Sequence, residues 1–246
     1  MADKPFKTTW KIGEVELPVK IYQEWRRSAR ASLRQGGLII RIPSFLTGAQ
    51  KEAQMMNFRN WAQQQLHKNQ HIAGQFQKRT YKDGDQLKVG SRTYTIRIEE
   101  TNLASHHAAQ EGDTILLRLT TKDSPDHAEK AIRHLLSRTI ANDFLPAITE
   151  QVMELNRKHV QKPIKKVSLK YNHSNWGSCS TKGNINLSTR LLFAPDDVIE
   201  YVIKHELAHL IEANHSDRFW KVVEDMMPDY KEKEKWLKVN GWKCDF

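Results

Sequence analysis

Residues 204–215 of this chain read Lys204-His205-Glu206-Leu207-Ala208-His209-Leu210-Ile211-Glu212-Ala213-Asn214-His215. On an α-helix, residues i and i+4 lie on one face, so His205 and His209 can offer two imidazole nitrogens to one metal ion, with Glu206 beside them. The HExxH pattern is typical of catalytic zinc sites in which the glutamate serves as general base. The segment therefore predicts a helix that carries two metal ligands and a base.

A catalytic zinc site needs a third protein ligand, and the sequence offers two candidates. Glu212 falls on the same helical face as His205, but about 10 Å further along the axis, so its carboxylate would have to reach far back. His215 follows Asn214, a residue that tolerates the left-handed conformation in which helices often end. The spacing from His209 to His215 also matches the third histidine of the HExxHxxGxxH pattern. We therefore expect the chain to turn near Asn214 and to bring His215 over the metal.

Chance is a poor explanation for this pattern. With 11 His among 246 residues, random HExxH matches amount to roughly 0.03 per chain. Residues 198–211 are also apolar around most of the helix, which predicts a buried helix. Buried His and Glu side chains are costly unless a metal or hydrogen-bond partners compensate them.

Length and composition indicate a globular protein with one large domain or two small ones. The mean hydropathy is −0.68, and no apolar run reaches the 18 residues that a membrane-spanning helix requires. Residues 1–7 lack the apolar core of a signal peptide, so we expect a cytoplasmic location and no membrane partner. Cys179 and Cys244 are too few for a disulfide framework or a cysteine metal site.

The net charge of +10 is concentrated towards the amino terminus. Residues 1–100 contain 18 Lys and Arg against nine Asp and Glu, whereas residues 201–246 contain eight against nine. A basic region can attract nucleotides, nucleic acid or acidic proteins, with the run at residues 26–30 as the best phosphate-binding candidate. It can equally be an ordinary solubility surface.

Hydrophobic periodicity predicts an α+β fold. Alternation with a period of two predicts strands within residues 8–42, 83–98, 113–119, 167–171 and 183–187. Patterns with a period of 3.6 predict helices that begin near residues 47, 126, 195, 216 and 229. The helical pattern from 126 to 159 contains Pro146, which should kink or split it. We expect a basic, β-rich region with one helix at residues 1–125, followed by a catalytic domain at residues 126–246.

Several sequence blocks resemble the YgjP-like metallopeptidases. The matching blocks are Trp176-Gly177-Ser178-Cys179-Ser180, Gly183-Asn184-Ile185-Asn186-Leu187, Arg190-Leu191, Pro195, the HExxH segment, Asn214-His215-Ser216 and Phe219-Trp220. The resemblance covers most of the chain and implies a zincin-like metallopeptidase domain, with one zinc ion bound by three histidines and Glu206 as the base that activates water. Through the metal helix alone, the chain is also similar to SprT-like and WLM proteases, some of which act on proteins near DNA. Three imidazoles favour zinc, although nickel, cobalt or manganese can replace it.

These observations make a zinc-dependent metallopeptidase, acting on a peptide or protein, the leading functional hypothesis. Candidate substrate-binding residues are Trp176, Asn184, Asn186 and Arg190. The strand from Asn184 could pair with an extended peptide or be an ordinary core or edge strand, and the Trp176 loop could shape the cleft or be a structural turn.

Two other classes of function remain open. The first is a metal-dependent nucleoside triphosphate pyrophosphatase or phosphohydrolase, in which Arg190 and the basic region would neutralise phosphates. The second is a nucleic-acid-associated protein with a structural zinc site. Glu206 speaks against this hypothesis, because a structural site needs no general base.

Overall fold

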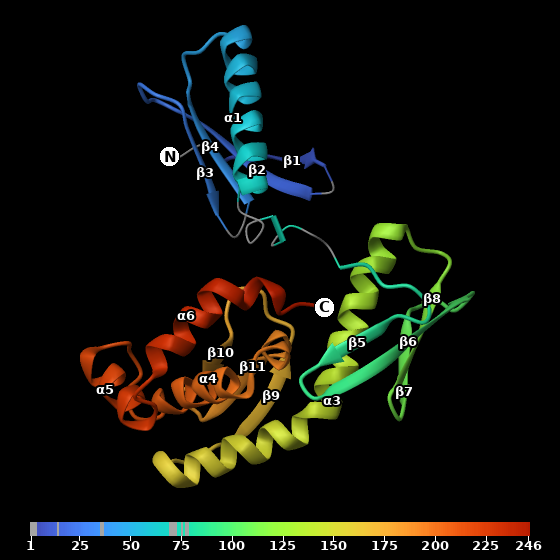
Figure 1. Ribbon diagram of the computed structural model, residues 1–246, viewed down its shortest axis with the longest axis vertical. Coiled ribbons are helices and arrows are strands. Elements are labelled where there is room, and N and C mark those ends of the chain that lie inside the picture. Colours follow the sequence, from blue (N-terminus) through green and yellow to red (C-terminus); the bar gives the residue numbers. More distant parts are fainter. Residues whose placement is uncertain (1–3, 14, 35–36, 69–72, 75, 77–78) are drawn as a thin grey trace. The chain divides into compact units, whose positions relative to one another are not determined.

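The computed structural model describes residues 4–13, 15–34, 37–68, 73–74, 76 and 79–246. The chain divides into two compact units, Met1–Lys78 and Arg79–Phe246, drawn in Figure 1 in blue to cyan and in teal to red, respectively. Both units combine helices with sheets, in agreement with the expected α+β class. No helix of the described ranges is long and apolar enough to cross a membrane.

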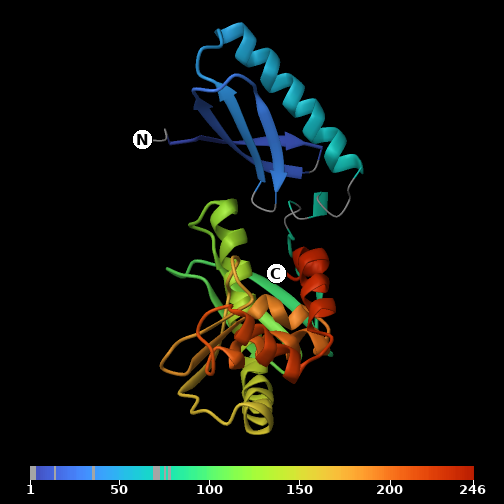
Figure 2. The same cartoon turned by 90° about the vertical axis from the view of Figure 1, so that its left-hand side faces the viewer.

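The first unit consists of one sheet and one long helix. Its strands are β1 (Phe6–Ile12), β2 (Val15–Glu24), β3 (Arg30–Arg34) and β4 (Gly37–Pro43), in the order β1-β2-β4-β3, and β2 runs parallel to β4. Helix α1 (Gly48–Lys68) covers one face of this sheet (Figure 2). The alternation in β2 explains the packing, since Leu17 and Val19 are buried in one cluster with Ala62 and Leu66 of α1.

The second unit contains two sheets joined by a 35-residue helix. The first sheet is made of β5 (Gln86–Val89), β6 (Arg92–Thr101), β8 (Thr114–Thr120) and β7 (His107–Glu111), in that spatial order; helix α3 (Pro125–His159) follows it. The second sheet is made of β10 (Gly177–Cys179), β11 (Asn184–Ser188) and β9 (Lys166–Lys170), in that order. The chain ends with η1 (Thr189–Phe193), α4 (Asp196–Ala208), α5 (Asp217–Met226), α6 (Tyr230–Asn240) and η2 (Gly241–Lys243).

A single core holds the second unit together. Ile96 of β6, Leu136 of α3, Ile185 of β11 and Ile203 of α4 are fully buried in one hydrophobic cluster. Because β5–β8 share this core with α3, the compact units divide between residues 78 and 79, earlier than the boundary between 125 and 126 that we expected from sequence.

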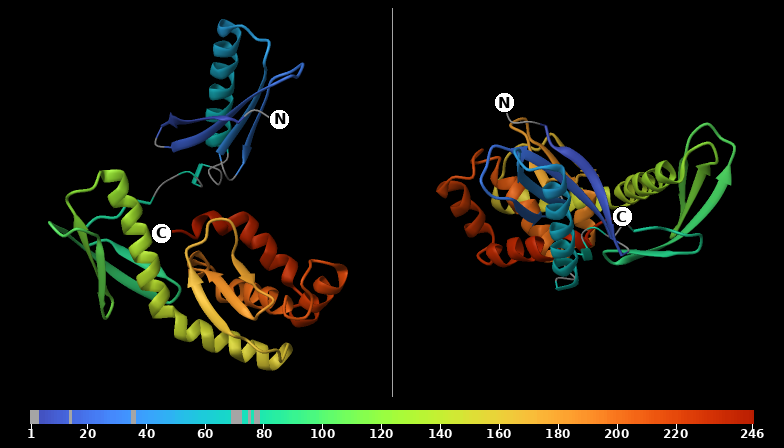
Figure 3. Two further views of the ribbon diagram at one scale, coloured as in Figure 1. Left: turned by 180° about the vertical axis from the view of Figure 1, so that it is seen from behind. Right: turned by 90° about the horizontal axis from the view of Figure 1, so that it is seen from above.

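Helix α3 bridges the two sheets. It starts at a Ser124 cap, whose side chain accepts a hydrogen bond from the His127 N–H, and it continues through Pro146 as one helix. Figures 1 and 3 show that it changes direction near its middle. A proline inside a helix removes one backbone hydrogen bond and clashes with the preceding turn, which accounts for this bend.

Candidate metal centre

Helix α4 presents the HExxH residues from its last turn. Pro195 precedes the helix, and Asp196 and Asp197 occupy its first turn, where carboxylates are favoured by the helix dipole. The helix ends at Ala208, and His209 is its C-terminal cap in right-handed helical geometry. His205 and His209 therefore lie on one side of the end of α4.

Three histidine side chains converge beyond this helix end. One ring nitrogen from each of His205, His209 and His215 lies within 4.8 Å of the others. The Nε2 atoms of His205 and His215 are 3.0 Å apart. Among the described residues, this is the only group of three or more His, Cys, Asp or Glu side chains whose ligand atoms gather closely enough to hold a metal ion.

The turn that delivers His215 lies earlier than we expected. The N–H of Leu210 bonds the carbonyl of Leu207, and the N–H groups of Ile211 and Glu212 both bond the carbonyl of Ala208. Asn214 has no left-handed backbone. The expectation of a left-handed turn at Asn214 was therefore wrong: tight turns of helical sense follow Ala208 as far as Glu212, and the chain then leads to His215 without a positive φ angle.

A backbone contact orients the second histidine. His209 Nδ1 lies 3.3 Å from the carbonyl oxygen of Glu212, so the imidazole donates its Nδ1–H there and keeps the Nε2 lone pair for a ligand. The Glu212 carboxylate lies outside the histidine cluster and 3.8 Å from Arg218 Nε. Glu212 thus acts on the site through its main chain.

The Phe219 ring packs against all three imidazoles. It is fully buried, and its centroid lies 4.9, 4.5 and 4.6 Å from those of His205, His209 and His215. Ser216 caps α5 by accepting a hydrogen bond from the Phe219 N–H, which fixes the residue at the start of the helix. The aromatic ring therefore restricts the orientation of the histidine rings.

Glu206 is a buried carboxyl group beside the cluster. Only 5% of the residue is exposed, and burial raises the pKa of its carboxyl to about 8. Its Oε2 is buried and has no hydrogen-bond partner in the described part of the chain. Burial and the two neighbouring imidazoles lower the pKa of His205 to about 4, which keeps this ring neutral, the form that binds metals.

Gly177 makes room for the Glu206 side chain. A Cβ atom on Gly177 would lie 2.5 Å from Glu206 Oε1 and 2.7 Å from its Cγ. The carboxyl group therefore packs directly against the backbone of β10. In the sequence, Gly177 stood out only as part of the Trp176–Ser180 block, and the 29-residue separation from Glu206 left no local signal for this contact.

These residues fit a divalent metal of the zinc type. Three neutral imidazoles are a common ligand set for catalytic zinc, which keeps a fourth position open. An unsatisfied carboxyl oxygen beside the cluster is expected where a further polar group binds, because a buried acceptor without a partner costs about 1–3 kcal/mol.

The asparagines that we predicted to bind substrate have partners within the second sheet. The Asn186 side chain accepts from Ser168 Oγ and donates to Ser178 Oγ. The Asn184 side chain donates to Ser180 Oγ at 3.1 Å. Strand β11 lies between β10 and β9, so the expectation that β11 could pair with a peptide was wrong, because both of its edges are occupied.

Trp176 and Arg190 contact each other and the carboxyl-terminal segment. The Arg190 guanidinium donates to the carbonyls of Cys244, His173 and Gly241, and it stacks 4.8 Å over the Trp176 ring. These partners engage most of the donors that we had expected to face a substrate. Trp176 nevertheless directly precedes Gly177, and so borders the Glu206 side of the site.

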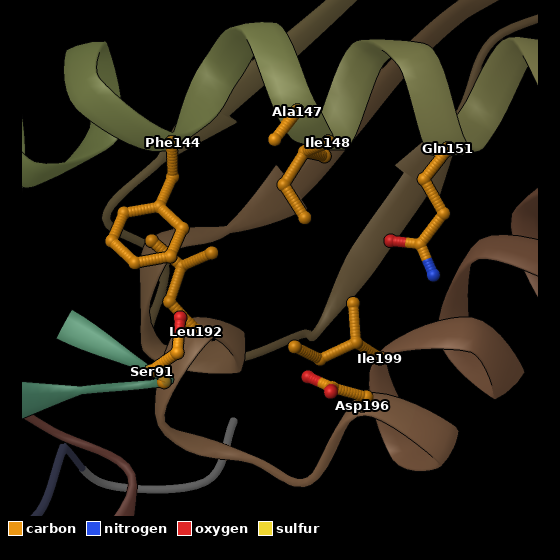
Figure 4. Close-up of a pocket in the computed structure, with 9 residues that line it drawn as sticks. Ser91, Phe144, Ala147, Ile148, Gln151, Leu192, Asp196 and Ile199 are labelled. Carbon is orange, nitrogen blue, oxygen red and sulfur yellow. The ribbon is translucent and has the colours of Figure 1, made fainter.

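A small cavity lies at the other end of α4 and is separate from the histidines (Figure 4). Its volume is about 170 Å³, and its walls include Phe144, Leu192 and Ile199, with Gln151 and Asp196 as polar groups. Nine residues separate Asp196 from His205, or roughly 13 Å along the helix axis. The cavity therefore does not contribute to the metal centre.

Comparison with known proteins assigns this chain to a metallopeptidase class. The family model described as "YgjP-like, metallopeptidase domain" matches residues 27–240. The chain therefore belongs to the YgjP-like family of metallopeptidase domains, as the sequence resemblance predicted.

One curated relative and two solved structures share parts of the chain. A "UTP pyrophosphatase" of Escherichia coli (strain K12) is 29% identical over 112 residues, which are 44% of this chain and 66% of that protein. The metallopeptidase zymogen of Pyrococcus abyssi abylysin is 27% identical with a TM-score of 0.34, over 36% of this chain and 89% of the other. The metallopeptidase zymogen of Methanocaldococcus jannaschii jannalysin is 20% identical with a TM-score of 0.32, over 36% and 90%.

Proposed function

We propose that the second unit is a zinc-dependent metallopeptidase domain that hydrolyses peptide bonds, with Glu206 as general base. The observation that carries this proposal is the convergence of three imidazoles beside a buried carboxyl group with an unsatisfied oxygen. Membership of the metallopeptidase family supports the peptidase assignment. Zinc is favoured by the ligand set, and nickel, cobalt or manganese are possible substitutes.

His205, His209 and His215 would hold one metal ion per chain. When bound, such an ion supplies Lewis acidity, lowering the pKa of a water ligand and polarising a substrate oxygen. A bound cation would favour the charged form of Glu206 against the effect of burial. The Glu206 carboxylate would then accept the proton of the attacking water at its free oxygen and pass it to the leaving amine. Gly177 leaves the space that this carboxylate occupies, and the Glu212 carbonyl holds the His209 ring in place.

The edge strand β10 offers a place for an extended peptide. Strand β10 pairs with β11 on one side only, and Ser178 stands opposite Asn186 in that antiparallel pair. The Ser180 N–H bonds Asn184 and the Ser188 N–H bonds Trp176, so the alternating ladder turns the backbone groups of Gly177 and Cys179 away from β11. The Gly177 carbonyl accepts a hydrogen bond from Asn175 Nδ2, so a substrate strand would pair with the Gly177 N–H and the Cys179 backbone and would pass beside Glu206.

The test is a paired assay of wild type and Glu206→Gln, with metal content measured in each preparation. The proposal expects one zinc per chain in both proteins, and cleavage of a denatured protein or peptide library by wild type alone. Glu212→Gln is the matched control, because it removes a nearby carboxylate outside the histidine cluster. Cleavage that survives Glu206→Gln would overturn the assignment of the base.

A metal-dependent nucleoside triphosphate pyrophosphatase is the second candidate. It is favoured by the 29% identity to a protein named for that activity, and a metal site that activates water can attack phosphorus as well as carbonyl carbon. The same preparations should be offered a panel of nucleoside triphosphates. Glu206-dependent release of pyrophosphate without peptide cleavage would favour this candidate, and silence across the panel would remove it.

The third hypothesis is a nucleic-acid-associated protein with a structural zinc site, and it predicts no hydrolysis in the same assays. Zinc would be retained at one per chain, and neither substrate class would be hydrolysed by wild type.

A further inference from the structure

The sheet of the first unit has two chemically different faces. Helix α1 packs on the face that carries Leu17, Val19 and Ile40. The neighbouring residues in each strand point to the opposite face, because side chains alternate along a strand. No element of the described part of this unit covers that second face, which we call the open face.

The open face collects cations from four strands. The strand registers place Lys7 opposite Lys20, and Arg30 opposite Arg41, in two directly facing pairs. Tyr22 stands beside Arg41 in the parallel pair of β2 and β4, with the Arg41 guanidinium 4.5 Å above the Tyr22 ring. The strand registers therefore place one aromatic ring among Lys7, Lys20, Arg30 and Arg41 on this face.

Like charges directly opposite each other on a sheet destabilise the fold. Lys7, Lys20 and Arg30 are exposed, and none of them has an ion-pair partner among the described residues. Two acidic side chains share the face: Glu24 pairs with Arg26 and Arg41, and Glu16 stands opposite Lys11. The unneutralised charges thus have no ion-pair compensation among the described residues of this unit, which suggests that they serve to bind an anion.

Two exposed aromatic residues lie side by side where the two central strands of this sheet end. Trp25 follows the end of β2 and Phe45 follows the end of β4, and the Ser44 N–H bonds the Glu24 carbonyl between them. Trp25 is 90% exposed and Phe45 59%, and their ring centroids are 6.2 Å apart in edge contact. Arg27, two residues after Trp25, is exposed as well.

Charge supports a polyanion as the ligand of this surface. Residues 1–78 contain 13 Lys and Arg against five Asp and Glu, so they carry +8 of the total charge of +10. Proteins that bind single-stranded nucleic acid without strong sequence preference combine cations for the phosphates with exposed aromatic rings on which bases stack. An acidic peptide would satisfy the cations but would leave an exposed indole without a matching partner.

We propose that the open face, together with the Trp25–Phe45 pair at the ends of the central strands, binds single-stranded nucleic acid, with Lys7, Lys20 and Arg30 contacting phosphates and Trp25 stacking on a base. This surface is independent of the metal centre and of the function proposed for it. RNA and DNA both offer phosphates and bases to this surface, and the test compares the two.

The experiment measures binding of the full-length chain to fluorescein-labelled 12-nucleotide uridine and deoxythymidine oligomers, by anisotropy, between 50 and 200 mM salt. Three variants are compared with wild type: Trp25→Ala, the double variant Lys7→Gln/Lys20→Gln, and the double variant Lys122→Gln/Lys130→Gln. The last removes the same charge from exposed positions of the second unit. All five substitutions in these proteins lie on the surface, and circular dichroism verifies that each variant is folded.

The proposal predicts a different signature for each variant. Each phosphate contact contributes about 0.7 to the slope of log affinity against log salt for single strands, so Lys7→Gln/Lys20→Gln should lower the slope by about 1.4. Trp25→Ala should weaken binding about tenfold at every salt concentration and leave the slope unchanged. Lys122→Gln/Lys130→Gln should bind like wild type.

Three results would overturn the proposal. They are the absence of wild-type binding to both oligomers at 50 mM salt, an equal loss of affinity in the two double variants, and an unchanged affinity in Trp25→Ala. Polyglutamate is included as a competitor: if it displaces the oligomers as well as unlabelled uridine oligomer does, the surface binds acidic polymers in general and the nucleic-acid assignment fails.

Discussion

The two units of this protein use their sheets in opposite ways. In the second unit, the sheet β10-β11-β9 and helix α4 share one large core, and the polar groups of the metal centre lie at its border. In the first unit, one helix covers one face of a four-stranded sheet, and the other face carries facing pairs of cations. A preorganised site with a buried base and half-buried to exposed ligands suits chemistry at a fixed point, whereas an open charged face suits a long and variable ligand.

The same contrast appears in how each unit uses its phenylalanines. Phe219 is fully buried against three imidazoles, whereas Phe45 is mostly exposed just after the end of β4. Stability in the second unit and function at its site therefore depend on the same residues. In the first unit, the surface proposed to bind a ligand is separate from the core.

The sharpest test of this contrast is a pair of phenylalanine substitutions. Phe219→Ala should lower the free energy of unfolding of the second unit by about 5 kcal/mol, since it opens a cavity in the core. It should also lower the zinc content, because the imidazoles lose their support. Phe45→Ala should change stability by less than about 0.5 kcal/mol. Urea unfolding followed by circular dichroism, with metal analysis, measures both, and similar losses in the two variants would refute the contrast.

Metal removal should act on one unit alone. At a free zinc concentration of about 1,000 times Kd, binding adds about 4 kcal/mol to the stability of the unit that holds the site. For residues 79–246, this corresponds to a fall in Tm of about 10 °C on chelation. Scanning calorimetry with and without EDTA should show this shift for one transition and none for the first unit. A shift of both transitions would contradict the separation of the units.

Glycine substitutions test the packing around the base. Gly177→Ala places a Cβ against the Glu206 carboxyl group, so the carboxylate must move, and a displacement of about 1 Å typically costs about a hundredfold in rate. We expect this loss in whichever hydrolysis assay proves to depend on Glu206, with zinc retained. Gly48→Ala in the first unit meets no atom within 4 Å and should leave activity unchanged. Full activity of Gly177→Ala would show that the observed carboxylate position is not the reactive one.

Local patterns in the sequence predicted the chemistry of the site better than its surroundings. The spacing of His205, Glu206 and His209 depends only on helix geometry, and period-two alternation located the main strands. The spacing to His215 was also readable, although the turn that delivers it was placed too late. Helical periodicity continues through Leu210 and Ile211, and gave no sign that the helix ends at Ala208.

Contacts between distant parts of the chain were not predictable in this way. The central position of β11, the approach of Gly177 to Glu206 and the three carbonyls around Arg190 all join residues far apart in sequence. The same is true of the open face, whose charges come from four strands and meet only through the strand registers. Composition indicated a basic region, but its arrangement required the order of the strands.

The smallest expected effect concerns a polar cluster that joins β6 and β7 to α3. The Asp143 carboxylate accepts hydrogen bonds from Tyr94 Oη and Gln110 Nε2 and pairs with Arg92. Burial alone would raise its pKa, but these partners outweigh burial and hold the pKa of Asp143 below the usual value. A carboxyl whose pKa is lower in the folded state stabilises the fold above its unfolded-state pKa, near 3.8, and this contribution is lost as the pH falls through the folded-state pKa.

Asp143→Asn should therefore flatten the acid limb of the stability curve for the second unit. Wild type should lose stability as the pH falls below about 4, whereas the variant should start from a lower stability at neutral pH and lose less on acidification. Urea midpoints measured between pH 2 and 7 give both curves, and Asp113→Asn, an exposed side chain in the turn before β8, controls for the loss of one negative charge. If Asp143→Asn and wild type had parallel curves, the cluster would make no contribution that depends on the Asp143 charge. The acid sensitivity of the second unit would then have to originate elsewhere in the unit.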